Sequence, residues 1–264
     1  MQTLTKQQMK SYDFPVTLQK AFTAEGYEVP RARAVVREDT KQPIAVVSSS
    51  YRLITHTEIV DRAMDYVKAI GKADAKFHMH ANGAKMLAEF TFLDKTLAVR
   101  KNEMVGLRVY VDNNYTAKGS MKVRIGGLCM WCLNGAINHQ DVFDISVPHI
   151  GNAEIIFPEP KLVMDSFAKT IGDFKRLTAI RMSDIEMVEH VQNAADSHIL
   201  PRSATKHFVA AEDRKEQSAW GLYNFFTNVI THKMNSRSTE IGRIKRLNNV
   251  GRWFGERFLG ETGG

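Results

Sequence analysis

The chain has 264 residues, of which 44% are hydrophobic and 25% are charged, the composition of a globular protein with a core of normal size. Its formal net charge of +7 favours an anionic partner, most simply nucleic acid. Two cysteines exclude a disulfide framework, and the lack of an apolar signal region or a bilayer-length apolar run predicts a cytoplasmic protein without a membrane partner.

The start of the chain is polar, and the first regular elements follow it. Residues 1–30 lack firm periodicity and are expected to form a flexible arm. Ala34–Val36 and Ile44–Val47 predict two short strands joined by turn-forming residues. An apolar stripe then predicts a helix over Thr57–Ile70, with Gly71 as its stop.

The next hairpin is the clearest local signal in the sequence. Lys76–Ala81 and Ala84–Phe92 flank Asn82-Gly83, the pair favoured in a two-residue type I′ turn, where Gly83 needs a positive φ. That turn fixes the register of the two strands. The expected opposite pairs are Met79 with Met86, Phe77 with Ala88, His80 with Lys85, and Lys76 with Glu89.

A second hairpin is predicted from the alternation in Val105–Val111 and Met121–Ile125. Its apolar residues define a core face. The other face is expected to be open and to carry, with Lys118 in the connecting turn, the residues Arg108, Tyr110, Lys122 and Arg124. Like charges on facing strands repel each other unless an anion lies between them. This face is therefore a candidate DNA-binding surface, and the alternative is a solvated face.

The predicted fold class is α+β. Gly127 to Gln140 is apolar on nearly all sides and predicts a helix buried against a four-stranded antiparallel meander, followed by a possible strand over Phe143–Val147. These elements make a sheet-plus-helix core over residues 31–150, and residues 151–264 form a mainly helical region. Ser183 and Glu186 predict a capping box. The expected helices are Lys161–Arg176, Asp184–Ser197, Ala204–Ala211, Ser218–His232 and Thr239–Phe258.

The last of these helices is basic. Seven Lys and Arg residues lie between Thr231 and Gly264, against three Glu, and aromatic residues are interleaved with them. Cations with aromatics suit phosphates and stacked bases. The alternative is an amphipathic helix docked on the core through its aliphatic residues, and both can hold on opposite faces. The candidate DNA-binding residues here are Arg243, Lys245, Arg246, Arg252 and Trp253.

No motif predicts a catalytic residue, a metal site or a cofactor. Cys129 and Cys132 have the C-x-x-C spacing at a predicted helix start, which leaves a redox site, a zinc site with a histidine, and two thiols packed as small apolar groups as alternatives. His78 and His80 share a strand face and could bind a metal as a pair.

Several stretches resemble a domain-of-unknown-function family found in phages and plasmids, over roughly residues 30 to 235. They are Ala34–Asp39, Val46–Ser48, Tyr51–Ile54, Val123–Asn134, and Ser218–Thr227 with His232. The resemblance implies an origin in a mobile element and carries no established activity.

The predicted meander with its packed helix also resembles, at the level of fold, the phage single-strand annealing recombination proteins. That resemblance implies a homo-oligomeric ring or filament holding the DNA backbone in a basic groove. The leading hypothesis is therefore an ATP-independent protein that binds and anneals single-stranded DNA. The alternatives are a phage accessory protein that binds a host or defence protein, and a metal-dependent enzyme using Cys129 and Cys132.

Overall fold

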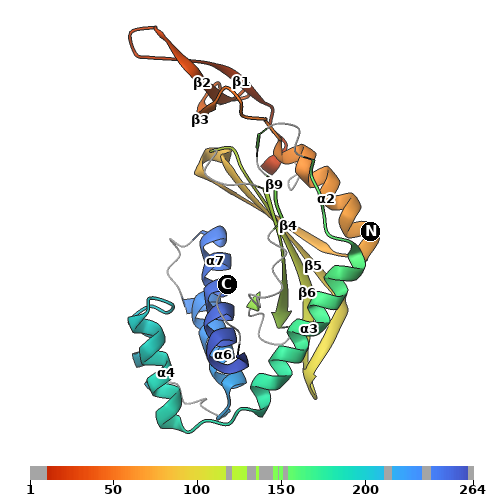
Figure 1. The fold of residues 1–264 in the computed structure, drawn as a ribbon, viewed down its shortest axis with the longest axis vertical. Coiled ribbons are helices and arrows are strands. Elements are labelled where there is room, and N and C mark those ends of the chain that lie inside the picture. The colour runs from red at the N-terminus through yellow and green to blue at the C-terminus, as the bar shows by residue number, and fades with distance from the viewer. Residues whose placement is uncertain are drawn as a thin grey trace. The chain divides into compact units, whose positions relative to one another are not determined.

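The computed structural model describes residues 11–116, 121–129, 135–136, 145–147, 149–150, 154–210, 216–233 and 239–260. Within them the chain forms two antiparallel sheets and six α-helices, with a mainly helical C-terminal half (Figure 1). The predicted α+β class is therefore confirmed. Among the described residues, no helix combines the length and the apolar character needed to cross a bilayer.

The smaller sheet has the strand order β1-β2-β3, with β1 at Val16–Phe22, β2 at Glu28–Arg37 and β3 at Pro43–Ser48. The two strands expected here are confirmed, as parts of β2 and β3. The flexible arm expected over residues 1–30 is wrong from Val16 onward, because that segment pairs with β2 along its length. One core cluster contains Phe14, Val16, Val35, Val47, Tyr51 and Tyr115.

Helix α2 spans His56–Ile70, as the apolar stripe predicted. It begins where the Thr55 side chain accepts a hydrogen bond from the backbone N–H of Glu58. It ends where the N–H of Gly71 donates to the carbonyl of Val67. Its buried face carries Ile59, Val60, Ala63, Val67 and Ile70, at helical spacing.

The larger sheet has the order β4-β5-β6-β7-β8, and β9 also pairs with β7. The strands are β4 at Asp74–His80, β5 at Lys85–Arg100, β6 at Glu103–Asn114, β7 at Met121–Cys129, β8 at Gly135–Ala136 and β9 at Ile145–Val147. Strand β9 confirms the last three residues of the strand expected over Phe143–Val147.

The predicted pairing of β4 with β5 is confirmed at all four pairs, although the turn differs from expectation. The loop comprises residues 81–84 and contains a 3-10 turn at Ala81–Gly83, instead of a two-residue turn. Ala81, Asn82 and Gly83 all have positive φ, with Gly83 at +91° as predicted. The register survives because lengthening a two-residue loop by one residue from each strand leaves every side chain on the same face.

The helix expected over Gly127–Gln140 is wrong where the structure describes it. Gly127 and Leu128 lie in β7 and pair with Ala136 and Gly135 of β8. An apolar run without clear periodicity fits a doubly buried strand as well as a buried helix, so the pattern could not separate them. Residues 130–134 and 137–140 lie outside the described residues.

The five helices expected after residue 160 are confirmed, including the capping box of Ser183 and Glu186. Helices α6 and α7 each continue into a π-helical turn, η2 at Val229–Lys233 and η3 at Gly255–Leu259. Ser218 and Thr239 cap the starts of α6 and α7. The five helices are α3 at Pro160–Ala179, α4 at Asp184–Asp196, α5 at Ala204–Ala210, α6 at Ala219–Asn228 and α7 at Glu240–Phe254.

The chain divides into two compact units. The first comprises Met1–Asp94, Arg108–Arg124 and Phe143–Leu162, and the second comprises Lys95–Leu107, Ile125–Val142 and Val163–Gly264. The core of the first contains the inner face of the small sheet and the buried face of α2. In the second unit α6 and α7 are in contact, and an aromatic cluster is built from Phe174, Trp220, Tyr223, Phe226 and Phe254.

Candidate functional site

The polar face of strands β6 and β7 is the surface that the sequence analysis predicted to bind DNA, and in the structure it continues onto β5 through Glu89. The structure corrects the expectation that it is open. Tyr110 is 0% exposed and Arg124 is 8% exposed, and Lys122 is half-buried. Lys118, in the connecting turn, lies outside the described residues.

Two cations of this polar face, Arg108 and Arg124, are paired with carboxylates. Arg108 lies with Nη2 3.2 Å from Oε1 of Glu89, and it donates from Nε to Thr91 Oγ1 at 3.1 Å and from Nη1 to Tyr110 Oη at 3.3 Å. Arg124 forms an ion pair and hydrogen bond with Asp112. Buried charges are stable in proteins when they are paired in this way.

Glu89 and Asp112 are the residues that the sequence reasoning missed. Both stand at alternating positions on the polar face, so the signal was present in the strand periodicity. Because the carboxylates neutralise Arg108 and Arg124, the repulsion expected between these two cations is removed without a bound polyanion. The polar face is better described as an internal ion-pair layer than as a nucleic-acid surface.

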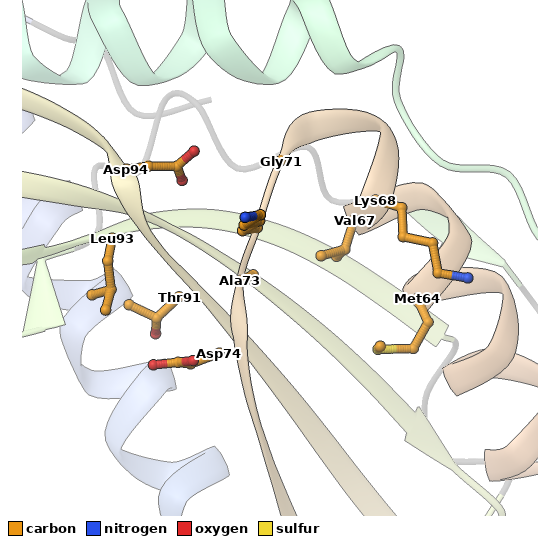
Figure 2. A pocket seen from close by; sticks show the side chains of 10 residues that line it. Met64, Val67, Lys68, Gly71, Ala73, Asp74, Thr91, Leu93 and Asp94 are labelled. Atoms are coloured by element: carbon orange, nitrogen blue, oxygen red, sulfur yellow. The ribbon is translucent and has the colours of Figure 1, made fainter. Parts of the chain in front are cut away.

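A cavity of about 1030 Å³ lies beside this layer, between the end of α2 and strands β4 and β5. Figure 2 shows Met64, Val67 and Lys68 contributed by the helix, and Thr91 and Leu93 by β5. The hydroxyl of Thr91 accepts the hydrogen bond from Arg108, so this cavity wall is tied to the ion-pair layer. The remaining lining residues are Gly71, Lys72, Ala73, Asp74 and Asp94.

This cavity has the size and mixed lining of a site for an amphipathic ligand. Its aliphatic walls suit an apolar group, and charges of both signs stand around it. Lys68 is engaged with Asp65, with Nζ 2.6 Å from Oδ1. The lining includes the charged residues Lys68, Lys72, Asp74 and Asp94, which could orient a bound ligand.

Helix α7 is the second surface that the sequence marked for DNA, and here the cations are exposed. Lys245, Arg246 and Arg252 are exposed, whereas the opposite side of the helix buries Ile244, Leu247, Val250 and Phe254. The basic face and the core-docked face therefore coexist on one helix, as the sequence allowed.

Two predicted residues of α7 lie differently from the exposed cations. Arg243 is half-buried and its Nη1 lies 2.7 Å from Oε2 of Glu240, so it is engaged within the helix. Trp253 is half-buried, with its ring against His190 and Phe258, and the guanidinium of Arg257 lies 5.1 Å from its ring centroid. Among the residues marked for DNA on this helix, the accessible cations are therefore Lys245, Arg246 and Arg252.

The cysteine and histidine candidates do not form a metal centre in the part of the chain that the structure describes. No group of three His, Cys, Asp or Glu there could hold a metal ion. Cys129 is the last residue of β7, so it is not at a helix start, and Cys132 lies outside the described residues. His78 Nε2 lies 3.9 Å from Glu89 Oε2, so this histidine stands beside the ion-pair layer.

His56 is a buried histidine at the start of α2 that the sequence analysis did not identify. It connects α2 to the β4–β5 loop through a hydrogen bond. His56 is fully buried, with Nδ1 3.0 Å from Asn113 Nδ2 and Nε2 2.8 Å from the carbonyl oxygen of Gly83. The amide can only donate and the carbonyl can only accept, so the ring is neutral with its proton on Nε2. Burial lowers the pKa of His56 to about 4.

Comparison with known proteins gives one match. The family model described as Domain of unknown function (DUF932) matches residues 43–250. This range runs from β3 into α7 and includes the ion-pair layer with Lys245 and Arg246, whereas Arg252 lies just beyond it. No curated protein and no solved structure matches the chain.

Proposed function

The chain belongs to the DUF932 family, whose function is unknown, and we propose from its own surface that it binds single-stranded DNA and anneals complementary strands. The observation that carries the proposal is the accessible basic face of α7, formed by Lys245, Arg246 and Arg252. The proposed protein works as a homo-oligomer and uses no nucleotide. Annealing and assembly rest on the fold-level resemblance of the antiparallel meander alone, because the helix expected to pack on it is wrong where the structure describes it.

The spacing of the three cations suits a strand of phosphates. At about 100° and 1.5 Å per residue, Lys245 and Arg252 stand on one side of the helix roughly 10 Å apart. Arg246 stands about a quarter turn from Lys245, next to the position of Trp253. Among the described residues, Lys245 and Arg246 have no ion-pair partner, so their charges are available to a ligand.

The mechanism follows from this arrangement. Cations that contact phosphates release condensed counterions, which drives binding without reading the base sequence. Contacts limited to the backbone leave the base edges free to pair with a second strand. Neutralising part of the backbone charge also lowers the repulsion between the two strands as they meet.

The test is the salt dependence of binding to single-stranded DNA. The variant Lys245→Ala/Arg246→Ala/Arg252→Ala should bind more weakly, and its slope of log affinity against log salt should shrink by about 2, at roughly 0.7 per lost contact. A matched control, Lys161→Ala/Lys175→Ala/Lys206→Ala, removes three exposed cations from α3 and α5 and should keep the wild-type slope.

Two results would contradict the proposal. Wild-type protein could show no salt-dependent binding, or the α7 variant could bind as tightly as the control. Annealing needs a separate assay, in which the protein accelerates pairing of complementary oligonucleotides. Light scattering that finds a monomer both with and without DNA would speak against annealing and would favour the host-protein alternative.

A further inference from the structure

The β1–β2 hairpin ends in two exposed aromatic residues. Phe22, the last residue of β1, is 58% exposed, and Tyr27, next to β2, is 73% exposed. Because Phe22 ends β1 and Tyr27 directly precedes β2, both residues belong to the end of the β1–β2 hairpin, an element that Figure 1 shows. Aromatic side chains have few rotatable bonds, so they lose little entropy when a ligand packs on them.

The two rings lie on opposite faces of the hairpin. Phe22 pairs with Glu28, whereas Tyr27 closes the turn with Thr23, whose N–H donates to its carbonyl at 2.8 Å. Successive residue pairs of a hairpin point to alternate faces. The Tyr27 N–H is also 3.3 Å from Thr23 Oγ1, and the Gly26 N–H bonds the Thr23 carbonyl, so the turn is held by three hydrogen bonds.

A bulge beside the turn presents a cation. The register shifts between Lys20 and Phe22, which leaves extra residues in β2, and among them Arg31 has φ of +59°. A left-handed conformation is unfavourable for arginine and persists only where its surroundings impose it. Here the Arg31 carbonyl accepts a hydrogen bond from Ser49 N–H at 2.8 Å, and the exposed side chain has no ion-pair partner among the described residues.

Around the tip, Lys20, Arg31 and Arg33 stand against Glu25 and Glu28, which leaves an excess of one positive charge. Glu28 lies between two cations, with Oε2 2.8 Å from Lys20 Nζ and Oε1 3.7 Å from Arg33 Nη1. Its negative charge is therefore compensated within the hairpin. Arg31 remains as an accessible cation that stands near the two rings along the chain.

We propose that the hairpin tip is a base-stacking element for single-stranded nucleic acid, an inference that rests on the proposed function. Bases stack on Tyr27 on one face and on Phe22 on the other, while Arg31 contacts a neighbouring phosphate. Two rings on opposite faces cannot both pack on one flat protein surface. A flexible single strand can pass the tip and offer a base to each ring.

The experiment measures affinity and salt slope for a single strand that carries 2-aminopurine, whose fluorescence reports stacking. Tyr27→Ala and Phe22→Ala should each weaken binding roughly 5- to 150-fold and alter the fluorescence, with the salt slope unchanged. Arg31→Gly, which suits the left-handed backbone, should instead shrink the slope by about 0.7. Tyr27→Phe and the control Val46→Ala, an exposed apolar residue of β3, should bind like wild type.

The outcomes separate this inference from the proposed function. If wild type binds with salt dependence but Tyr27→Ala and Phe22→Ala match it in affinity and fluorescence, only the stacking inference is overturned. If wild type shows no salt-dependent binding, both are overturned. If Tyr27→Ala lowers the molar mass in light scattering and leaves DNA affinity intact, the tip contacts a second copy of the chain, which also overturns the inference.

Discussion

The ion-pair layer and helix α7 both carry cations at the spacing of their secondary structure, yet the two regions use them differently. In the layer, Arg124 is buried and Arg108 is half-buried, and each is held by a carboxylate. On α7, Lys245 and Arg246 are exposed and without an ion-pair partner among the described residues. A sequence pattern that places cations on one face therefore leaves open whether those charges serve the fold or a ligand.

The difference between the two regions lies in the hydration of their cations. A buried cation has given up its hydration, so its partner is essential to stability. An exposed cation keeps its hydration and contributes little to folding, which leaves its charge free for an anion. We therefore expect substitutions to act on stability in the layer and on binding in α7.

The strongest test of this comparison is Asp112→Ala, which leaves Arg124 buried without its carboxylate. The free energy of unfolding, measured with urea, should fall by about 3–5 kcal/mol. Replacing both partners with apolar residues, Asp112→Leu/Arg124→Met, should recover most of that loss because no buried charge remains. A fall of less than about 1 kcal/mol in the single variant would show that the layer is hydrated.

The next effect concerns pH and the neutral His56. Its folded-state pKa of about 4 lies below the ordinary value of 6.5. Between these two pH values the His56 imidazole is protonated in the unfolded chain and neutral in the folded chain. The stabilisation is therefore complete above about pH 6.5 and falls by roughly 3 kcal/mol as pH decreases to 4.

The matched variant for this effect is His56→Gln, which cannot titrate and should show a flatter dependence of unfolding free energy on pH. The pKa of His149 is also lowered by burial, so part of the slope should persist in that variant. Equal slopes in wild type and His56→Gln would contradict the buried neutral ring.

Gly83→Val tests the same corner without removing a charge. Gly83 has φ of +91°, and a Cβ there would lie 2.7 Å from Cζ of Phe14, so the melting temperature should drop with a loss of more than about 1 kcal/mol. Gly26→Val is the matched control, since Gly26 has φ of +87° with nothing within 4 Å. It should cost less, because it adds backbone strain without the clash.

The smallest expected change in stability belongs to Lys245→Ala/Arg246→Ala/Arg252→Ala. Because these side chains are exposed, unfolding free energy should stay within about 0.5 kcal/mol of wild type. Measuring both its melting curve and its DNA affinity shows whether the α7 cations serve binding or folding. A loss of several kcal/mol would mean that α7 uses its cations for folding, as the ion-pair layer does.

Local patterns predicted the elements well where one face is buried and the other is not. The stripe on α2, the cap at Ser183 and the β4–β5 register depend on neighbours in sequence, which a sequence displays. The prediction failed in the Gly127 region because an apolar run without clear periodicity fits a strand as well as a helix.

The ion-pair layer could be only half predicted, for a related reason. The alternation correctly separated Arg108, Tyr110 and Arg124 from the apolar face, but alternation says nothing of what covers the polar face. The partner of Arg108 is Glu89, on a different hairpin, so the pairing depends on strand order. The prediction of exposed cations on α7 did not require the arrangement of other elements. The periodicity of one helix shows which of its residues face the core and which face solvent.

The four-residue loop at residues 81–84 shows a rule for how this hairpin can change length. Its register matches that of a two-residue turn, so gaining or losing residues in twos preserves the orientation of every side chain in β4 and β5. A single extra residue that slips the pairing of β4 with β5 by one position, instead of enlarging the loop, would turn Phe77 and Met79 away from the apolar face and bring His78 and His80 into it. Length variants in which the loop itself takes up the extra residue keep the register.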